Sequence, residues 1–153
     1  MKAVVLDLDG TLVDSTFQHA LTWHRAFAQH GLAMEAWRAH RAIGMGSDML
    51  VPGLAGEEWA KEHGEAAADT ESALFRELIA NVKPLPGARA FLEAMKDRGH
   101  PTVLSSSCNQ ADLDVYLELL GARDLLDDWT TSDDVERTKP APDVVQVALK
   151  KLG

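Results

Sequence analysis

The feature that most constrains the fold is a short apolar run near the start of the chain, followed at once by an acidic turn. Residues 3–6 read Ala-Val-Val-Leu, and residues 7–10 read Asp-Leu-Asp-Gly. A run that is apolar at every position and bounded by Asp and Gly is typical of a strand buried on both faces of a parallel sheet. The chain is therefore predicted to open with such a strand, which carries Asp7 and Asp9 at its carboxyl end.

The stretch after this strand has helical spacing of its apolar residues. In its first helix, Phe17, Leu21 and Phe27 are predicted to lie on one buried face. A loop is predicted between the second helix and the third, at residues 44–48. The predicted helices cover residues 16–30, 35–42 and 57–80.

Two prolines and a glycine within residues 83–87 end the helical stretch, and the pattern then changes. Helices now alternate with short apolar strands, which is the order expected for a parallel sheet with right-handed crossovers. The sequence therefore predicts an α/β fold, in which residues 1–15 and 83–153 form the sheet-containing domain and residues 16–82 an inserted all-helical domain. The later elements are predicted as helices at 88–98, 112–120 and 142–152 and strands at 102–104 and 129–131.

Charge and composition exclude several classes of partner. The chain of 153 residues has a formal net charge of -9, which repels nucleic acid and anionic lipid, so neither is an expected partner. No apolar stretch approaches the roughly 20 residues needed to span a bilayer, and residues 3–6 are too short for the apolar part of a signal peptide. The single cysteine, Cys108, excludes an internal disulfide and fits a reducing compartment, so a cytoplasmic location is expected.

Polar residues gather after each predicted strand, at the carboxyl ends where a parallel α/β sheet binds its ligand. Asp7 and Asp9 are two positions apart, so they share one face of the strand end. Two carboxylates this close repel each other unless a cation lies between them, and Mg²⁺ suits oxygen ligands. Gly10 allows a tight turn that exposes backbone amides to an anion. These features predict a metal-assisted site for an anionic ligand.

The stretch Asp7–Ser15, with the sequence Asp-Leu-Asp-Gly-Thr-Leu-Val-Asp-Ser, resembles the first motif of phosphatases of the haloacid dehalogenase superfamily. The resemblance implies a Rossmann-like core in which Asp7 is the nucleophile and forms an aspartyl-phosphate. It implies that Asp9 protonates the leaving group and later activates water. By the same resemblance, the Asp7 side chain and the Asp9 backbone carbonyl bind Mg²⁺, and Gly10 and Thr11 contact the substrate.

A run of three serines follows the second predicted strand. A hydroxyl at a strand end can donate a hydrogen bond to a phosphoryl oxygen, and the family places one Ser or Thr there. Counting from Gly99 favours Ser106 as the catalytic hydroxyl, with Ser105 as its rival. Ser105 and Ser107 are predicted to bind substrate. The alternative is that the serines only cap the following helix.

The segment Lys139-Pro140-Ala141-Pro142-Asp143 resembles the third motif of the same family. A lysine ammonium group can neutralise both a phosphoryl group and a nearby carboxylate. Lys139 is therefore predicted to be catalytic. Asp133 and Asp134, which precede it, are interpreted as a structural acidic turn.

The helical insert resembles the cap of the β-phosphoglucomutase and phosphoglycolate phosphatase branch, through Asp14, Ser15, His19 and Trp23. Sugar phosphomutases of that branch carry an arginine on the cap loop, and residues 43–48 contain none, which weakens the mutase hypothesis. His19 is predicted to bind substrate. A histidine packed on the cap helix is the equal alternative.

The resemblance implies further strands and a fourth, acidic motif beyond the end of this chain. Residues 144–153 contain no acid, so the chain is interpreted as a fragment that lacks the C-terminal part. Two other interpretations stay open. The sheet could be completed by a partner or by self-association through the open edge at residues 3–6. Alternatively, Asp133, Asp134 or water could complete the metal site.

The function predicted from the sequence is a Mg²⁺-dependent phosphatase that acts on a small phosphorylated metabolite through Asp7. One alternative is a sugar phosphomutase. The other is a truncated, non-catalytic core of this superfamily that serves as a binding or self-associating module.

Overall fold

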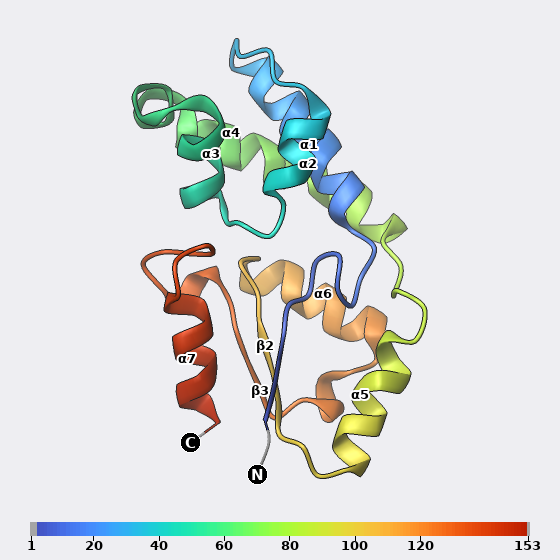
Figure 1. Ribbon diagram of the computed structural model, residues 1–153. Helices are drawn as coiled ribbons and strands as arrows, with labels where there is room; N and C mark the ends of the chain where they lie inside the picture. The colour runs from blue at the N-terminus through green and yellow to red at the C-terminus, as the bar shows by residue number, and fades with distance from the viewer. Residues whose placement is uncertain (1–2, 153) are drawn as a thin grey trace. The chain divides into compact units, whose positions relative to one another are not determined.

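The computed structural model describes residues 3–152, which fall into two compact units (Figure 1). One unit combines the residues up to Asp14 with those from Lys83 onward, and the other is Ser15–Val82. The chain thus passes between the units twice. The two passages lie together on the first unit, because the Asp14 backbone N–H donates to the Lys83 carbonyl at 2.8 Å.

Three parallel strands form the sheet of the first unit and confirm the predicted α/β fold. The strands are β1 (Val4–Leu6), β2 (Thr102–Ser105) and β3 (Asp128–Thr130), in the spatial order β1-β2-β3. Figure 1 shows them between α7 (Asp143–Lys151) on one side and α5 (Ala88–Asp97) and α6 (Gln110–Leu120) on the other. Two short 3-10 turns, η2 (Arg123–Leu125) and η3 (Ser132–Asp134), flank β3.

The first strand is less buried than the sequence predicts. All four residues of β2 are buried, whereas Val4, Val5 and Leu6 of β1 are only half-buried. The reason is the strand order, because within residues 3–152 β1 is an edge strand with β2 as its one neighbour. The prediction of a strand buried on both faces is therefore wrong for β1, although its position and its parallel pairing are as predicted.

The helices of this unit bury the faces that their spacing indicates. On α6, Leu113, Leu117 and Leu120 are buried at intervals of four and three residues, which is one face of a helix. The helix begins at Asn109, whose side-chain oxygen accepts a hydrogen bond from the Asp112 N–H at 2.9 Å. It ends at Gly121, whose φ of 56° lies in the left-handed region that favours glycine. These local features fix where α6 begins and ends.

The second unit is all-helical. The sequence predicted a loop at residues 44–48 and no helix between it and residue 57, but a helix starts at Ser47. Pro52 and Gly53 are poor helix formers, so the sequence pattern does not indicate this helix. Leu50 and Val51 are buried and pack the helix against the core of the unit. The elements are α1 (Thr16–Gln29), α2 (Ala36–Ala42), α3 (Ser47–Ala55), α4 (Glu57–Leu78) and the turn η1 (Ile79–Asn81).

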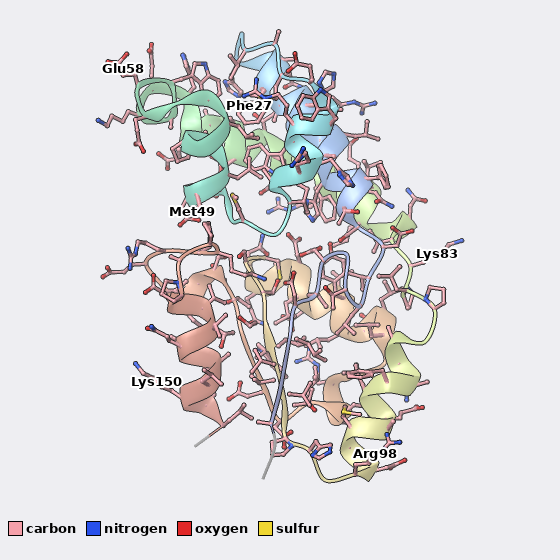
Figure 2. All side chains as sticks on the ribbon, viewed as in Figure 1. Phe27, Met49, Glu58, Lys83, Arg98 and Lys150 are labelled. Carbon is pink, nitrogen blue, oxygen red and sulfur yellow. The ribbon has the colours of Figure 1, made fainter. Side chains whose placement is uncertain are left out.

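The buried face of α1 agrees with the predicted one at Phe27 but not at the other two predicted positions. Phe17 and Leu21 are 66% and 48% exposed, so their predicted burial is wrong. The core side of the helix carries Trp23 and Phe27, whose ring centroids lie 5.4 Å apart. Phe27 points into the interior of the helical unit in Figure 2 and also contacts the Trp59 ring at 5.5 Å. The side of the helix that carries the Trp23 and Phe27 rings is therefore the buried one.

No helix among residues 3–152 is both long enough and apolar enough to cross a bilayer.

The assignment of the α1 faces can be tested with one substitution made at two positions. Phe27→Ala removes a fully buried ring and is expected to lower the free energy of unfolding by about 3–5 kcal/mol. Phe17→Ala is the matched control, since its ring is mostly exposed, and a loss below about 1 kcal/mol is expected. Urea unfolding followed by circular dichroism measures both. Equal losses would contradict the assignment.

Candidate active site

One lysine joins two of the predicted site segments. The Lys139 Nζ donates to the Asp7 Oδ1 at 2.5 Å and to the Ser105 backbone carbonyl at 3.0 Å. The side chains of Lys139 and Asp7 are 22% and 35% exposed, so the ion pair is partly shielded yet open to a ligand. The carboxyl ends of β1 and β2 therefore meet at a cation supplied by the loop that precedes α7, while a catalytic role for Lys139 stays a prediction.

The loop after β1 is organised around the Leu8 carbonyl. This oxygen accepts backbone N–H bonds from Thr11 at 3.1 Å and from Leu12 at 2.8 Å, and the Leu8 side chain is fully buried. Gly10 has a φ of 72°, and its N–H donates to the Val13 carbonyl at 2.9 Å. The Gly10 and Thr11 amides thus already hold the loop together, so their predicted role in substrate binding stays a prediction.

The three serines after β2 differ in their hydrogen bonds. The Ser106 Oγ accepts a bond from the Cys108 N–H at 3.1 Å. The Ser105 and Ser107 Oγ atoms are buried and have no hydrogen-bond partner in the part of the chain that the structure describes. Ser106 thus stabilises the turn but does not cap α6, which begins at Asn109. The Ser105 and Ser107 hydroxyl groups remain available for a ligand.

The acidic turn before Lys139 holds the end of β3 against the end of β2. Asp134 accepts from the Thr131 N–H at 2.9 Å in a capping box, and the Asp133 Oδ2 accepts from the Gln110 N–H at 3.0 Å. The Ser132 N–H donates to the Cys108 carbonyl at 2.9 Å. Both acids therefore bind backbone groups, in agreement with their interpretation as structural.

The pKa of the Cys108 thiol, in the turn after β2, is affected by burial and by the two carboxylates of the first segment. Burial raises the pKa of the Cys108 thiol well above its usual range, and the negative charges of Asp9 and Asp7 raise it further. The charges of both carboxylates are therefore felt in the turn after β2. Cys108 directly follows the serine run, so its position in the sequence already indicates that it lies in this turn.

The donor set for a metal ion is small. Within residues 3–152, no group of three or more His, Cys, Asp or Glu side chains is arranged to hold a metal ion. Asp7 and Asp9 are the acidic candidates, and one carboxylate oxygen of Asp7 is bound to Lys139. Mg²⁺ commonly keeps several waters and takes one or two carboxylates plus substrate phosphate. The residues present therefore fit a weak Mg²⁺ site that substrate would complete.

His19 belongs to the helical unit and is engaged in its packing. Its Nδ1 lies 3.0 Å from the Glu71 Oε1, and its ring stacks on Phe75 with a centroid distance of 3.7 Å. Glu71 also accepts a 2.7 Å hydrogen bond from the Thr22 hydroxyl, so this buried acid joins α1 to α4. These contacts favour the packing alternative, and contact with substrate stays a prediction for His19.

The site combines a parallel sheet with an aspartate at the end of its first strand that is bound to a lysine. The chain belongs to the haloacid dehalogenase-like hydrolase family, whose model matches residues 1–153. A putative phosphatase, YhcW of Bacillus subtilis, is 28% identical over all of this chain and 70% of its own length. The phosphoglycolate phosphatase of Rhodospirillum rubrum is 30% identical over 99% of this chain and 67% of its own length. The crystal structure of a hydrolase from Pseudomonas syringae aligns with a TM-score of 0.91 and 29% identity, over 99% of this chain and 70% of that one.

The state of the Cys108 thiol gives a chemical test of the site's electrostatics. Because the pKa of the thiol is raised, little thiolate is present at pH 8, and only the thiolate reacts with iodoacetamide. We expect alkylation of the folded protein to be at least about tenfold slower than that of the protein in urea. Alkylation at the same rate in both states would show that the thiol is neither shielded from solvent nor affected by the two carboxylates.

Proposed function

We propose that the chain is a phosphatase that hydrolyses a small phosphorylated metabolite through a phosphoryl group carried on Asp7. The observation that carries the proposal is the convergence of Lys139 on the Asp7 carboxylate and the Ser105 carbonyl. The similarity to a putative phosphatase and to a phosphoglycolate phosphatase supports the same reaction class. The metabolite itself is not assigned.

The two acids of the first segment divide the chemistry between them. The Asp7 carboxylate attacks phosphorus, the bond to the leaving oxygen breaks, and Asp9 gives that oxygen a proton. Water then attacks the phosphorus of the aspartyl-phosphate and passes a proton to Asp9, which frees Asp7 and releases phosphate. Lys139 lowers the repulsion between the Asp7 carboxylate and the incoming phosphate anion, because its charge lies 2.5 Å from the nucleophile.

Mg²⁺ is the cofactor that fits this donor set, with Asp7 and Asp9 as its protein ligands. When bound, it supplies positive charge at the phosphoryl oxygens. Asp133 and Asp134 are poor candidates to complete the site, because both already accept backbone hydrogen bonds around η3.

Among the serines, the contacts favour Ser105 over Ser106 as the donor to the phosphoryl group. The Ser105 carbonyl is bound to the same ammonium group as Asp7, and its hydroxyl has no partner in the described part of the chain. Counting along the sequence favours Ser106, but its Oγ already accepts a hydrogen bond from the Cys108 N–H.

The helical unit, Ser15–Val82, is proposed to be the cap that the family resemblance predicts. Residues 43–48 lack the arginine of the sugar phosphomutases, so a phosphatase is favoured over a mutase. A cytoplasmic location remains a prediction from the single cysteine.

A second candidate function rests on the strand order. Within residues 3–152, β1 is an edge strand, and its three apolar residues are half-buried. Such an edge can pair with another strand, so a non-catalytic module that self-associates through β1 is the alternative. This alternative predicts a dimer in sedimentation and no release of phosphate.

The proposed reaction is tested by phosphate release from p-nitrophenyl phosphate and from a panel of sugar and small-acid phosphates. Release is expected to require Mg²⁺, to stop in EDTA, and to fall by about a thousandfold or more in Asp7→Asn. Asp97→Asn, at the exposed end of α5, is the matched control and should keep full activity. Equal release by wild type and Asp7→Asn would contradict the proposal, and phosphate retained on the product would indicate a mutase.

The roles of the serines are separated by two alanine variants. Ser105→Ala is expected to raise KM about tenfold with little effect on folding, because it removes a donor to the ligand. Ser106→Ala is expected to lower the free energy of unfolding by about 1 kcal/mol, because the Cys108 N–H loses its acceptor. Steady-state kinetics and urea unfolding measure the two effects. The opposite pattern would restore Ser106 as the residue that binds phosphate.

A further inference from the structure

Two neighbouring strands of the sheet end in buried hydroxyl groups that have no hydrogen-bond partner within residues 3–152. The Ser105 Oγ at the end of β2 and the Thr130 Oγ1 at the end of β3 have no hydrogen-bond partner among the described residues. Ser105 is 3% exposed and Thr130 is 0% exposed. A buried polar group without a partner costs about 1–3 kcal/mol, so native structures rarely keep one without a reason.

The register of the sheet places these two hydroxyl groups next to each other. Ser105 and Thr130 are partners in the parallel pairing of β2 with β3, so their side chains leave the sheet on the same face. The Ser106 N–H donates to the Thr130 carbonyl at 3.0 Å, which holds this register at the ends of the two strands. Rotation about χ1 can therefore bring the two hydroxyl oxygens within hydrogen-bond distance.

Thr130 also lies at the same level of the sheet as Asp7, two strands away. Leu6 pairs with Leu104, so continuing the register by one residue sets Asp7 opposite Ser105. Strands are spaced at about 4.8 Å, which puts β3 roughly 10 Å from β1. A phosphoryl group on Asp7 is thus beyond the direct reach of the Thr130 hydroxyl but within reach of the Ser105 hydroxyl.

We propose that Thr130 is a positioning residue of the phosphate site, a role that rests on the proposed phosphatase function. With a phosphoryl group present, the Thr130 hydroxyl donates to the Ser105 Oγ, and the Ser105 hydroxyl donates to a phosphoryl oxygen. Each hydroxyl has one donor and can accept, so this chain gives both of them partners. The first bond fixes the Ser105 rotamer and strengthens the second by polarisation. No proton is transferred along this chain of hydrogen bonds.

The experiment compares Thr130→Val, which removes the hydroxyl at constant shape, with Thr130→Ser, which retains it. The probe is inorganic phosphate, measured by calorimetry on the full chain with Mg²⁺ and as a competitor of p-nitrophenyl phosphate. Thr130→Val is expected to weaken phosphate binding and to raise KM by about five- to tenfold, the effect of one neutral hydrogen bond. Thr130→Ser is expected to recover most of this loss. Urea unfolding should show Thr130→Val to be as stable as wild type or more so, since the lost group had no partner.

A matched control is Thr102→Val at the other end of β2, where the buried hydroxyl donates to the His100 carbonyl at 3.0 Å. This variant is expected to lose stability and to bind phosphate like wild type. The double variant Ser105→Ala with Thr130→Val should bind phosphate no more weakly than Ser105→Ala alone, because Thr130 acts through Ser105.

Two results would overturn the inference while the phosphatase function stands. One is wild-type phosphate affinity in Thr130→Val. The other is an effect of Thr130→Val that adds in full to that of Ser105→Ala. A wild-type chain that neither releases nor binds phosphate would instead overturn the proposed function, and the role of Thr130 with it.

Discussion

The ion pair between Lys139 and Asp7 is the contact on which the arrangement of the site depends. It joins residues that are 132 positions apart, and the same ammonium group binds the carbonyl of Ser105. Such a contact requires a parallel sheet, because only then do β1 and β2 end at the same edge. Its electrostatic consequence is local: in a chain of net charge -9, Lys139 supplies the positive charge that lets an anion approach a carboxylate.

The polar groups around this ion pair fall into two classes. Asp133, Asp134 and Ser106 bind backbone N–H groups, so they hold the ends of β2 and β3 in place. Ser105 and Thr130 are equally close to these strand ends, but their hydroxyl groups are buried and have no partner within the described residues. The first class serves the fold at little cost, while the second carries a desolvation cost that a bound phosphoryl group would remove.

The sequence predicted the parts of the structure that depend on short-range patterns. The strand before Asp7 and the lysine of the third segment both lie where the motifs place them. The sequence missed α3, because Pro52 and Gly53 resemble a break. It predicted the burial of Phe27 correctly but wrongly placed Phe17 and Leu21 on the same buried face of α1. The positioning role proposed for Thr130 could not be predicted from the sequence. It depends on strand register and burial, which no local pattern contains.

The most direct test of the account is to look for the phosphoryl group on Asp7 itself. The chain would be mixed with Mg²⁺ and p-nitrophenyl phosphate, quenched in acid during turnover and digested for mass spectrometry. The account predicts one phosphoryl group on the peptide that contains Asp7, and none on that peptide in Asp7→Asn. Turnover with the phosphoryl group on Ser105, Ser106 or His19, or with no modified peptide at all, would contradict the assignment of Asp7 as the nucleophile.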